Sequence, residues 1–269
     1  MLKDITIGQY MPGNSIVHRC DPRAKMLFTL LLLTVLFMIR GLVGFGIMLV
    51  FLGIVTMIAK IPLLYIVKGL KPMMYILLFT LVINVFFSRG ETILWQWGWL
   101  QVSYEGILIA VRMGLRLVLL IMATSLLTLT TTPILITDGM ERLLHPLKVI
   151  RLPVHEIAMM MSIALRFIPT LLEEADKIMK AQKARGANFD TGNVMQRAKS
   201  YLPILIPLII GAFRRAEELA LAMEARCYRG GEGRTKLRQL RYGGVDLVCA
   251  VVLLLYCGCV LLLDRLWIV

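Results

Sequence analysis

The chain has 269 residues, of which 58% are hydrophobic, and it carries a formal net charge of +13. A soluble domain of this length fills its core with far fewer apolar residues, so the composition indicates an integral membrane protein. The excess positive charge requires no nucleic-acid partner, because lysine and arginine gather in cytoplasmic loops beside anionic lipid.

Five uncharged apolar runs approach or exceed the roughly 18 residues that indicate a membrane-spanning helix. They are Met26–Ile39, Gly41–Ala59, Pro72–Ser88, Leu117–Thr137 and Leu247–Leu263. Only Arg40 separates the first two runs, so they could form either one bent helix or a tight hairpin of two helices. Two spans are favoured, since one helix through both runs would exceed a bilayer about 30 Å thick. Before the first run, Asp21 and Pro22 predict a capped helix start that needs no binding role.

The placement of lysine and arginine predicts the orientation. Positive residues precede the first run and separate the second from the third, whereas the link between the third and fourth is poorer in them. The N-terminus is therefore predicted to be cytoplasmic, with Trp95, Trp97 and Trp99 at the outer interface. No strand-like alternation of useful length is found, so the predicted fold is all-α, with about five transmembrane helices and a cytoplasmic region of long amphipathic helices.

Composition divides the chain into residues 1–132 with four spans, residues 133–242 with mixed apolar and charged residues, and residues 243–269 with the last span. The middle part predicts three helices, at about Pro133–Lys148, Pro153–Arg185 and Val194–Cys227. The second and third each begin with an apolar half and end with an amphipathic half. Both endings are therefore expected to leave apolar surroundings for water. Internal prolines predict bends, at Pro169 in the second helix and at Pro203 and Pro207 in the third.

The second and third of these helices end alike. Each ending has an alanine, an arginine and a further small residue, and the second copy follows the first by 41 residues. The two copies are Ala184-Arg185-Gly186 and Ala225-Arg226-Cys227. One such ending is explained by an ordinary helix terminus. Two copies favour a binding role, in which each thin helix end enters a groove of a partner and its arginine binds a carboxylate there. The partner is then expected to have two similar sites.

The two endings, together with "PGNSIVHRCDPRAK" and "RFIPTLLEEADKIMKAQKARGANFD", resemble the transmembrane T component of energy-coupling factor (ECF) transporters over most of the chain. The resemblance implies that the two long helices cross in an X, and that the Ala184–Gly186 and Ala225–Cys227 motifs each enter a groove of one of two ABC-type ATPases. Cys227 departs from the glycine of the motif, and the glycines at 230 and 231 are expected to end the third helix instead.

The same resemblance implies a third partner, a membrane-embedded substrate-binding S component. The ATPase pair, which is a homodimer or a heterodimer, would bind ATP and Mg, and this chain itself would bind no cofactor and no metal. The implied function is energy coupling, without catalysis by this chain, for uptake of a micronutrient (a vitamin or a metal ion) across the plasma membrane of a prokaryote.

Four further residues are candidate contacts with the S component or the membrane. Arg112 and Arg116 lie on one face of a helix near the fourth span. Charges inside a membrane are usually paired or functional. Either these arginines pair with Glu105 or lipid headgroups, or they contact the partner membrane protein. Met160 belongs to a methionine run that suits an adaptable surface or ordinary packing. Arg166 is expected near the membrane surface.

Motifs of enzymes are missing from the sequence. It contains no Gly-x-Ser-x-Gly and no phosphate-binding loop of the Walker type, and His155-Glu156 lacks the second histidine of a zinc protease helix. A membrane enzyme acting on lipids would need paired acidic residues or a metal cluster. The remaining alternative is a conventional ABC permease subunit that forms the translocation path itself, with one coupling helix in each subunit. Two endings in one chain favour a single subunit that serves both ATPases.

Overall fold

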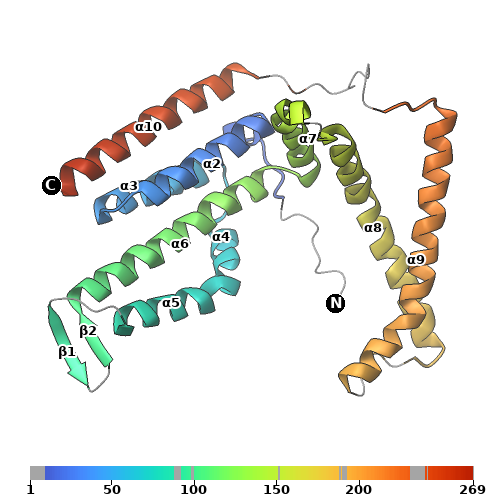
Figure 1. The fold of residues 1–269 in the computed structure, drawn as a ribbon, viewed down its shortest axis with the longest axis horizontal. Coiled ribbons are helices and arrows are strands. Elements are labelled where there is room, and N and C mark those ends of the chain that lie inside the picture. The colour runs from blue at the N-terminus through green and yellow to red at the C-terminus, as the bar shows by residue number, and fades with distance from the viewer. Residues whose placement is uncertain are drawn as a thin grey trace. The chain divides into compact units, whose positions relative to one another are not determined.

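The computed structural model describes residues 10–87, 92–97, 100–150, 152–187, 189, 193–230, 240 and 242–268. Figure 1 shows a chain built almost wholly of helices, which confirms the all-α prediction. The helices are α1 (Ile16–Arg19), α2 (Pro22–Met38), α3 (Leu42–Ile58), α4 (Leu63–Leu70), α5 (Met74–Phe87), α6 (Tyr104–Thr130), α7 (Pro133–Leu144), α8 (Val154–Ala184), α9 (Val194–Ala225) and α10 (Gly244–Ile268), with short 3₁₀ turns η2 (Lys71–Met73) and η3 (His145–Ile150).

By its contacts the chain falls into two compact units. Residues 8–139 and 239–269 form one, which we call the membrane unit, and residues 140–238 belong to the other, which we call the crossed unit. The last helix therefore packs with the N-terminal helices, although the whole crossed unit separates them in the sequence. The division by composition into residues 1–132, 133–242 and 243–269 stays a prediction.

Four described helical segments are long and apolar enough to span a membrane: Leu64–Phe87, Tyr104–Thr130, Val154–Ala184 and Gly244–Leu266, with Leu42–Ile58 as a shorter apolar helix. Helices lie over all five predicted runs, but α2, which lies over the first, is not among these segments, and the bounds of the fourth are wrong. The helix begins at Tyr104 and ends at Thr130, because Pro133 starts a new helix. α8 also reaches the length of a span, although its sequence was assigned to the coupling region.

α2 and α3 form a tight hairpin, so the prediction of two separate helices is confirmed. The chain turns at residues 39–41, and Val17, just before α2, packs against Ala59 and Ile61 just after α3. α2, α3, α6 and α10 then share one apolar core, in which Leu36, Leu119 and Val260 are fully buried (Figure 1). This core holds the last helix of the chain against the first hairpin.

Two charged side chains close the turn between α2 and α3. The Asp264 carboxylate, on α10, accepts hydrogen bonds from the backbone N–H groups of Arg40 at 3.0 Å and Gly41 at 2.8 Å. Arg116 donates from Nη2 to the carbonyl of Ile39 at 2.9 Å. Backbone groups at helix ends lack partners within the helix, so these contacts satisfy groups that lipid cannot. A Cβ at Gly44 would lie 2.7 Å from Asp264 Oδ1, which keeps this position small.

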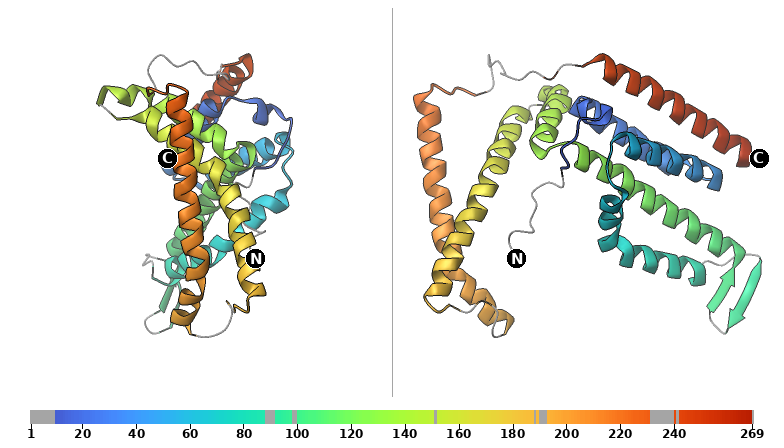
Figure 2. Two further views of the ribbon diagram at one scale, coloured as in Figure 1. Left: turned by 90° about the vertical axis from the view of Figure 1, so that its right-hand side faces the viewer. Right: turned by 180° about the vertical axis from the view of Figure 1, so that it is seen from behind.

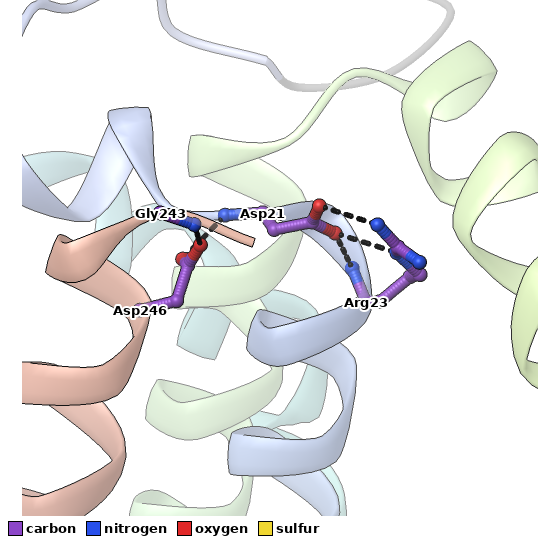
Figure 3. Close-up of polar contacts among 4 residues, drawn as sticks. All are labelled: Asp21, Arg23, Gly243 and Asp246. Carbon is purple, nitrogen blue, oxygen red and sulfur yellow. Dashed lines mark hydrogen bonds and ion pairs between the residues drawn. The ribbon is translucent and has the colours of Figure 1, made fainter. Parts of the chain in front are cut away.

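Another polar cluster fixes the opposite end of α10 (Figure 3). Asp21 caps α2 by accepting from the N–H of Arg23 at 2.9 Å, and it binds the Arg23 guanidinium through Nε at 3.1 Å and Nη2 at 3.0 Å. Asp246 accepts from the N–H of Asp21 at 2.8 Å and of Gly243 at 2.7 Å. The predicted cap at Asp21 and Pro22 is confirmed. We call Asp21, Arg23, Gly243 and Asp246 the buried cap cluster.

Two neighbours extend this cluster. The buried Lys25 ammonium donates to the carbonyl of Thr130 at 3.0 Å and to the hydroxyl of Thr131 at 3.3 Å, which ties the end of α6 to the start of α2. The Sγ atoms of Cys20 and Cys249 lie 3.6 Å apart. Burial raises the pKa of the Cys20 thiol to about 12, so that this thiol stays protonated at neutral pH.

The link between α5 and α6 contains a short antiparallel pair, β1 (Ile93–Trp97) and β2 (Leu100–Ser103), in which Trp95 pairs with Val102 and Trp97 with Leu100. The expectation that the chain has no strands is wrong here, because tryptophan and isoleucine favour extended backbone even in a run too short to alternate clearly. Trp99 lies outside the described residues, and the membrane-interface position of the tryptophans stays a prediction.

Candidate functional site: two matched helix endings

The two endings are carried by α8 and α9, which run in opposite directions and cross (Figure 1), as the views of Figure 2 also show. At the crossing, Glu174 of α8 forms an ion pair with Arg215 of α9 at 2.5 Å. Gly211 faces the same carboxylate, and a Cβ there would lie 3.1 Å from Glu174 Oε1. A glycine at this position therefore lets the two helices approach closely. Because α8 and α9 are antiparallel, the two endings lie at opposite ends of the crossed pair.

Both helices contain internal prolines. Figure 1 shows that α9 changes direction in its first half, which contains Pro203 and Pro207. Each of these prolines removes a backbone donor and crowds the preceding turn, so the predicted bend of α9 is confirmed. α8 continues through Pro169 as one helix of 31 residues, as α9 does through its prolines over 32 residues, and the bend at Pro169 stays a prediction.

The first ending closes by a pair of backbone hydrogen bonds. α8 ends at Ala184, Arg185 is the C-cap, and Gly186 has a positive φ of 87°. The N–H of Gly186 donates to the carbonyl of Lys183 at 3.0 Å, and the N–H of Ala187 donates to that of Gln182 at 3.0 Å. This combination is the Schellman motif, in which a residue of left-handed conformation lets the chain satisfy the last carbonyls of the helix.

The second ending has the same geometry despite its cysteine. α9 ends at Ala225, Arg226 is the C-cap, and Cys227 has a φ of 56°. The N–H of Cys227 donates to Glu224 at 2.8 Å, and the N–H of Tyr228 donates to Met223 at 3.0 Å. The expectation that the glycines at 230 and 231 end this helix is wrong, because Cys227 itself takes the left-handed position that Gly186 takes in the first ending.

Exchanging the small residues of the two endings is expected to change their stability in opposite directions. Gly186→Ala introduces a Cβ at positive φ and should destabilise the first ending by about 1 kcal/mol, whereas Cys227→Gly should stabilise the second by a similar amount. Amide hydrogen exchange at residues 183–187 and 224–228 measures both effects, and each exchange rate should change by about fivefold. Gly53→Ala is the control, since a Cβ at Gly53 meets open space. Unchanged exchange in both variants would contradict the assigned conformations.

Both arginines are available for contact with another molecule. Arg185 and Arg226 are exposed, as are the alanines Ala184 and Ala225 before them. Within the described part of the chain, neither guanidinium forms an ion pair or a side-chain hydrogen bond. The helix ends are thin and each carries one unpaired cation, as the sequence pattern predicts. That these residues bind ATPases stays a prediction.

The structure brings a third predicted residue to the second ending. Arg166, on the apolar first half of α8, lines the same cavity as Arg226 and Cys227. The second ending is exposed, as expected, and the antiparallel crossing also lays it beside the apolar half of α8. The sequence did not single out Arg229, which also lines this cavity; its spacing of three residues from Arg226 was the available signal.

The other predicted contacts are not among the residues that line this cavity. Met160 is 57% exposed on α8. Arg112 and Arg116 are on α6 in the membrane unit, and Arg116 has a structural role through its bond to Ile39 and its position 5.5 Å from the ring of Phe45. Glu105 accepts hydrogen bonds from Thr92 instead of pairing with these arginines. A contact of Arg112, Arg116 or Met160 with another membrane protein stays a prediction.

Sequence reasoning did not predict the buried cap cluster and its neighbour Lys25 as one unit. Only the cap by Asp21 was predicted, because it is local. The other contacts join residues that are far apart in the sequence, and no pattern within α2 indicates Asp246 as the acceptor.

Comparison with known proteins matches residues 13–237 to the family described as CbiQ, cobalt transport protein. The chain is 53% identical over 264 residues to "Energy-coupling factor transporter transmembrane protein EcfT" of Ruminiclostridium cellulolyticum, covering 98% of each chain. Identity to proteins of the same name is 54% in Acidaminococcus fermentans, with 94% of each chain covered, and 49% in Bacillus subtilis, with 94% of this chain and 96% of the relative covered. The chain therefore belongs to the family of transmembrane T components of ECF transporters.

Proposed function

We propose that this subunit couples two ABC-type ATPase chains to a membrane-embedded S component, with one helix ending bound to each ATPase. The observation that carries the proposal is the pair of matched Schellman endings, each with an exposed arginine at the C-cap, at opposite ends of one crossed helix pair. A dimer of similar ATPases offers two similar grooves, and two separate arginine-bearing ends suit two such grooves. A charge-assisted bond from each guanidinium to a carboxylate fixes each contact.

The crossed pair gives this arrangement a mechanical function. The ion pair between Glu174 and Arg215 and the close approach at Gly211 join α8 and α9 at one point along their length. ATP binding and hydrolysis move the two ATPases, and the bound endings move with them. The stiff helices transmit this displacement through their crossing. The S component, held by the membrane part, then receives a movement that opens or closes its route. ATP and Mg are bound and used by the partner chains.

The transported substrate in this proposal is a micronutrient, a vitamin or a metal ion, which the S component selects. The description of the matching family concerns cobalt, a metal of this class. The subunit lies in the plasma membrane with the N-terminus and the crossed unit on the cytoplasmic side, as the lysine and arginine placement favours.

Co-purification tests the proposal against the conventional permease. The tagged subunit, expressed with its chromosomal neighbours and extracted in mild detergent, is expected to retain two ATPase chains and one further small membrane protein. A complex of two copies of this subunit with two ATPases, lacking another membrane protein, would support the permease instead. Native mass spectrometry of the eluted complex distinguishes these compositions.

A further inference from the structure

The crossed unit contains a cavity of about 620 Å³ between the first half of α8 and the last turns of α9. Five apolar side chains line it, and we call them its apolar floor. Met159, Ile163 and Phe167 contribute to it from α8, one helical turn after another, and Leu219 and Met223 contribute from α9. A cavity of this size with an apolar floor accommodates part of a hydrocarbon chain.

Three positive side chains line the same cavity. Arg166 lies on α8, and Arg226 and Arg229 lie at and after the end of α9; all three are exposed, and none of the described residues that line the cavity is an aspartate or a glutamate. Three guanidinium groups around an apolar floor match an amphiphile with an anionic head. Guanidinium groups bind phosphate through paired N–H donors, and basic pockets between helices of membrane proteins are suited to phospholipid headgroups.

We propose that this cavity binds an anionic phospholipid, with the phosphate held by Arg166 and Arg229 and one acyl chain on the apolar floor. The location favours a lipid as the source of the phosphate, because the floor belongs to the part of α8 that is apolar enough to enter a bilayer. A free phosphate ion would gain nothing from the five apolar side chains. The site does not depend on the ATPase contacts proposed above, although Arg226 borders both, and it can be measured on the subunit alone.

Lipid titration of the purified full-length subunit, delipidated in neutral detergent, tests this site by native mass spectrometry. One molecule of phosphatidylglycerol is expected to bind, at least about tenfold more tightly than phosphatidylcholine. Arg166→Gln with Arg229→Gln should weaken phosphatidylglycerol binding by about tenfold or more. The matched control is Lys180→Gln with Arg214→Gln, which removes the same charge from exposed positions of α8 and α9 outside the cavity and should leave binding unchanged.

A second variant tests the cavity separately from the charge. Ile163→Trp fills the apolar floor and keeps all three arginines, and it should also lose the bound lipid. Equal binding to the double arginine variant and the wild type would overturn the proposal, as would equal binding of the two lipids. Binding that survives Ile163→Trp would mean that surface charge alone attracts lipid. Displacement of the lipid by excess inorganic phosphate would identify the site as one for the free anion.

Discussion

Reversal of both C-cap arginines, in an Arg185→Glu and Arg226→Glu variant, is expected to abolish retention of the ATPase chains while the membrane-inserted subunit stays at its normal level. Each substitution replaces an attractive contact with a carboxylate by repulsion between like charges. Loss of one partner of a desolvated charge pair costs roughly 2–5 kcal/mol of binding free energy, so one reversal should weaken the complex and two should prevent its isolation. Quantitative co-purification from equal amounts of membrane measures the effect.

The control for this experiment reverses two other cations on the same helices. Lys180→Glu with Arg214→Glu changes the net charge equally, at exposed positions outside both endings, and should retain the ATPases. Transport by the single variants should fall more than their protein level does. If the double variant at the endings still retains both ATPases, Arg185 and Arg226 are not the contacts; if protein level and transport fall together, the defect is one of folding.

Removal of the Asp21 carboxylate is expected to produce the largest loss of stability in the membrane unit. Its side chain is 2% exposed, and that of Arg23 is 10% exposed, so Asp21→Ala leaves a buried guanidinium without its counter-ion and α2 without its cap. An unpaired buried charge costs about 3–5 kcal/mol. The apparent melting temperature of the purified subunit, followed by tryptophan fluorescence, should fall by roughly 10 °C.

A double variant separates the buried charge from the other effects of this substitution. Arg23→Met in the Asp21→Ala background removes the unpaired cation and should recover part of the lost stability, because the longer apolar side chain fills the same space without desolvated charge. Glu217→Ala, at an exposed position of α9, should melt as the wild type does. A double variant less stable than Asp21→Ala would show that Arg23 contributes through packing and its contact with the Tyr242 ring, 4.3 Å away.

Local features of the fold could be predicted from the sequence. The ends of α8 and α9 were placed within about two residues, since alanine-arginine endings follow amphipathic turns that are readable from adjacent residues. The start of α6 was missed because Arg112 and Arg116 interrupt its apolar pattern. The cost of placing Arg116 in a span is offset by its bond to the Ile39 carbonyl, which joins residues 77 positions apart.

The candidate site was only half predictable for a similar reason. The endings themselves are local, whereas the cavity beside Arg226 exists because an antiparallel crossing brings residue 166 next to residue 226. Nothing within either helix specifies that crossing. Cys227 shows the converse case: an L-amino acid adopts a left-handed conformation because the two backbone hydrogen bonds of the ending outweigh a cost of roughly 1–2 kcal/mol.

The two carboxylates of α10 have a consequence for the order in which the protein is made. Asp246 closes the start of α2, and Asp264, roughly 27 Å further along the helix, closes the turn into α3. Both acceptors are translated after the entire crossed unit. The ribosome must therefore complete the crossed unit before either acceptor is available to the backbone donors at the start of α2 and at the turn into α3. A chain stalled within the crossed unit has neither acceptor, so both ends of α2 lack the contacts that the finished protein gives them.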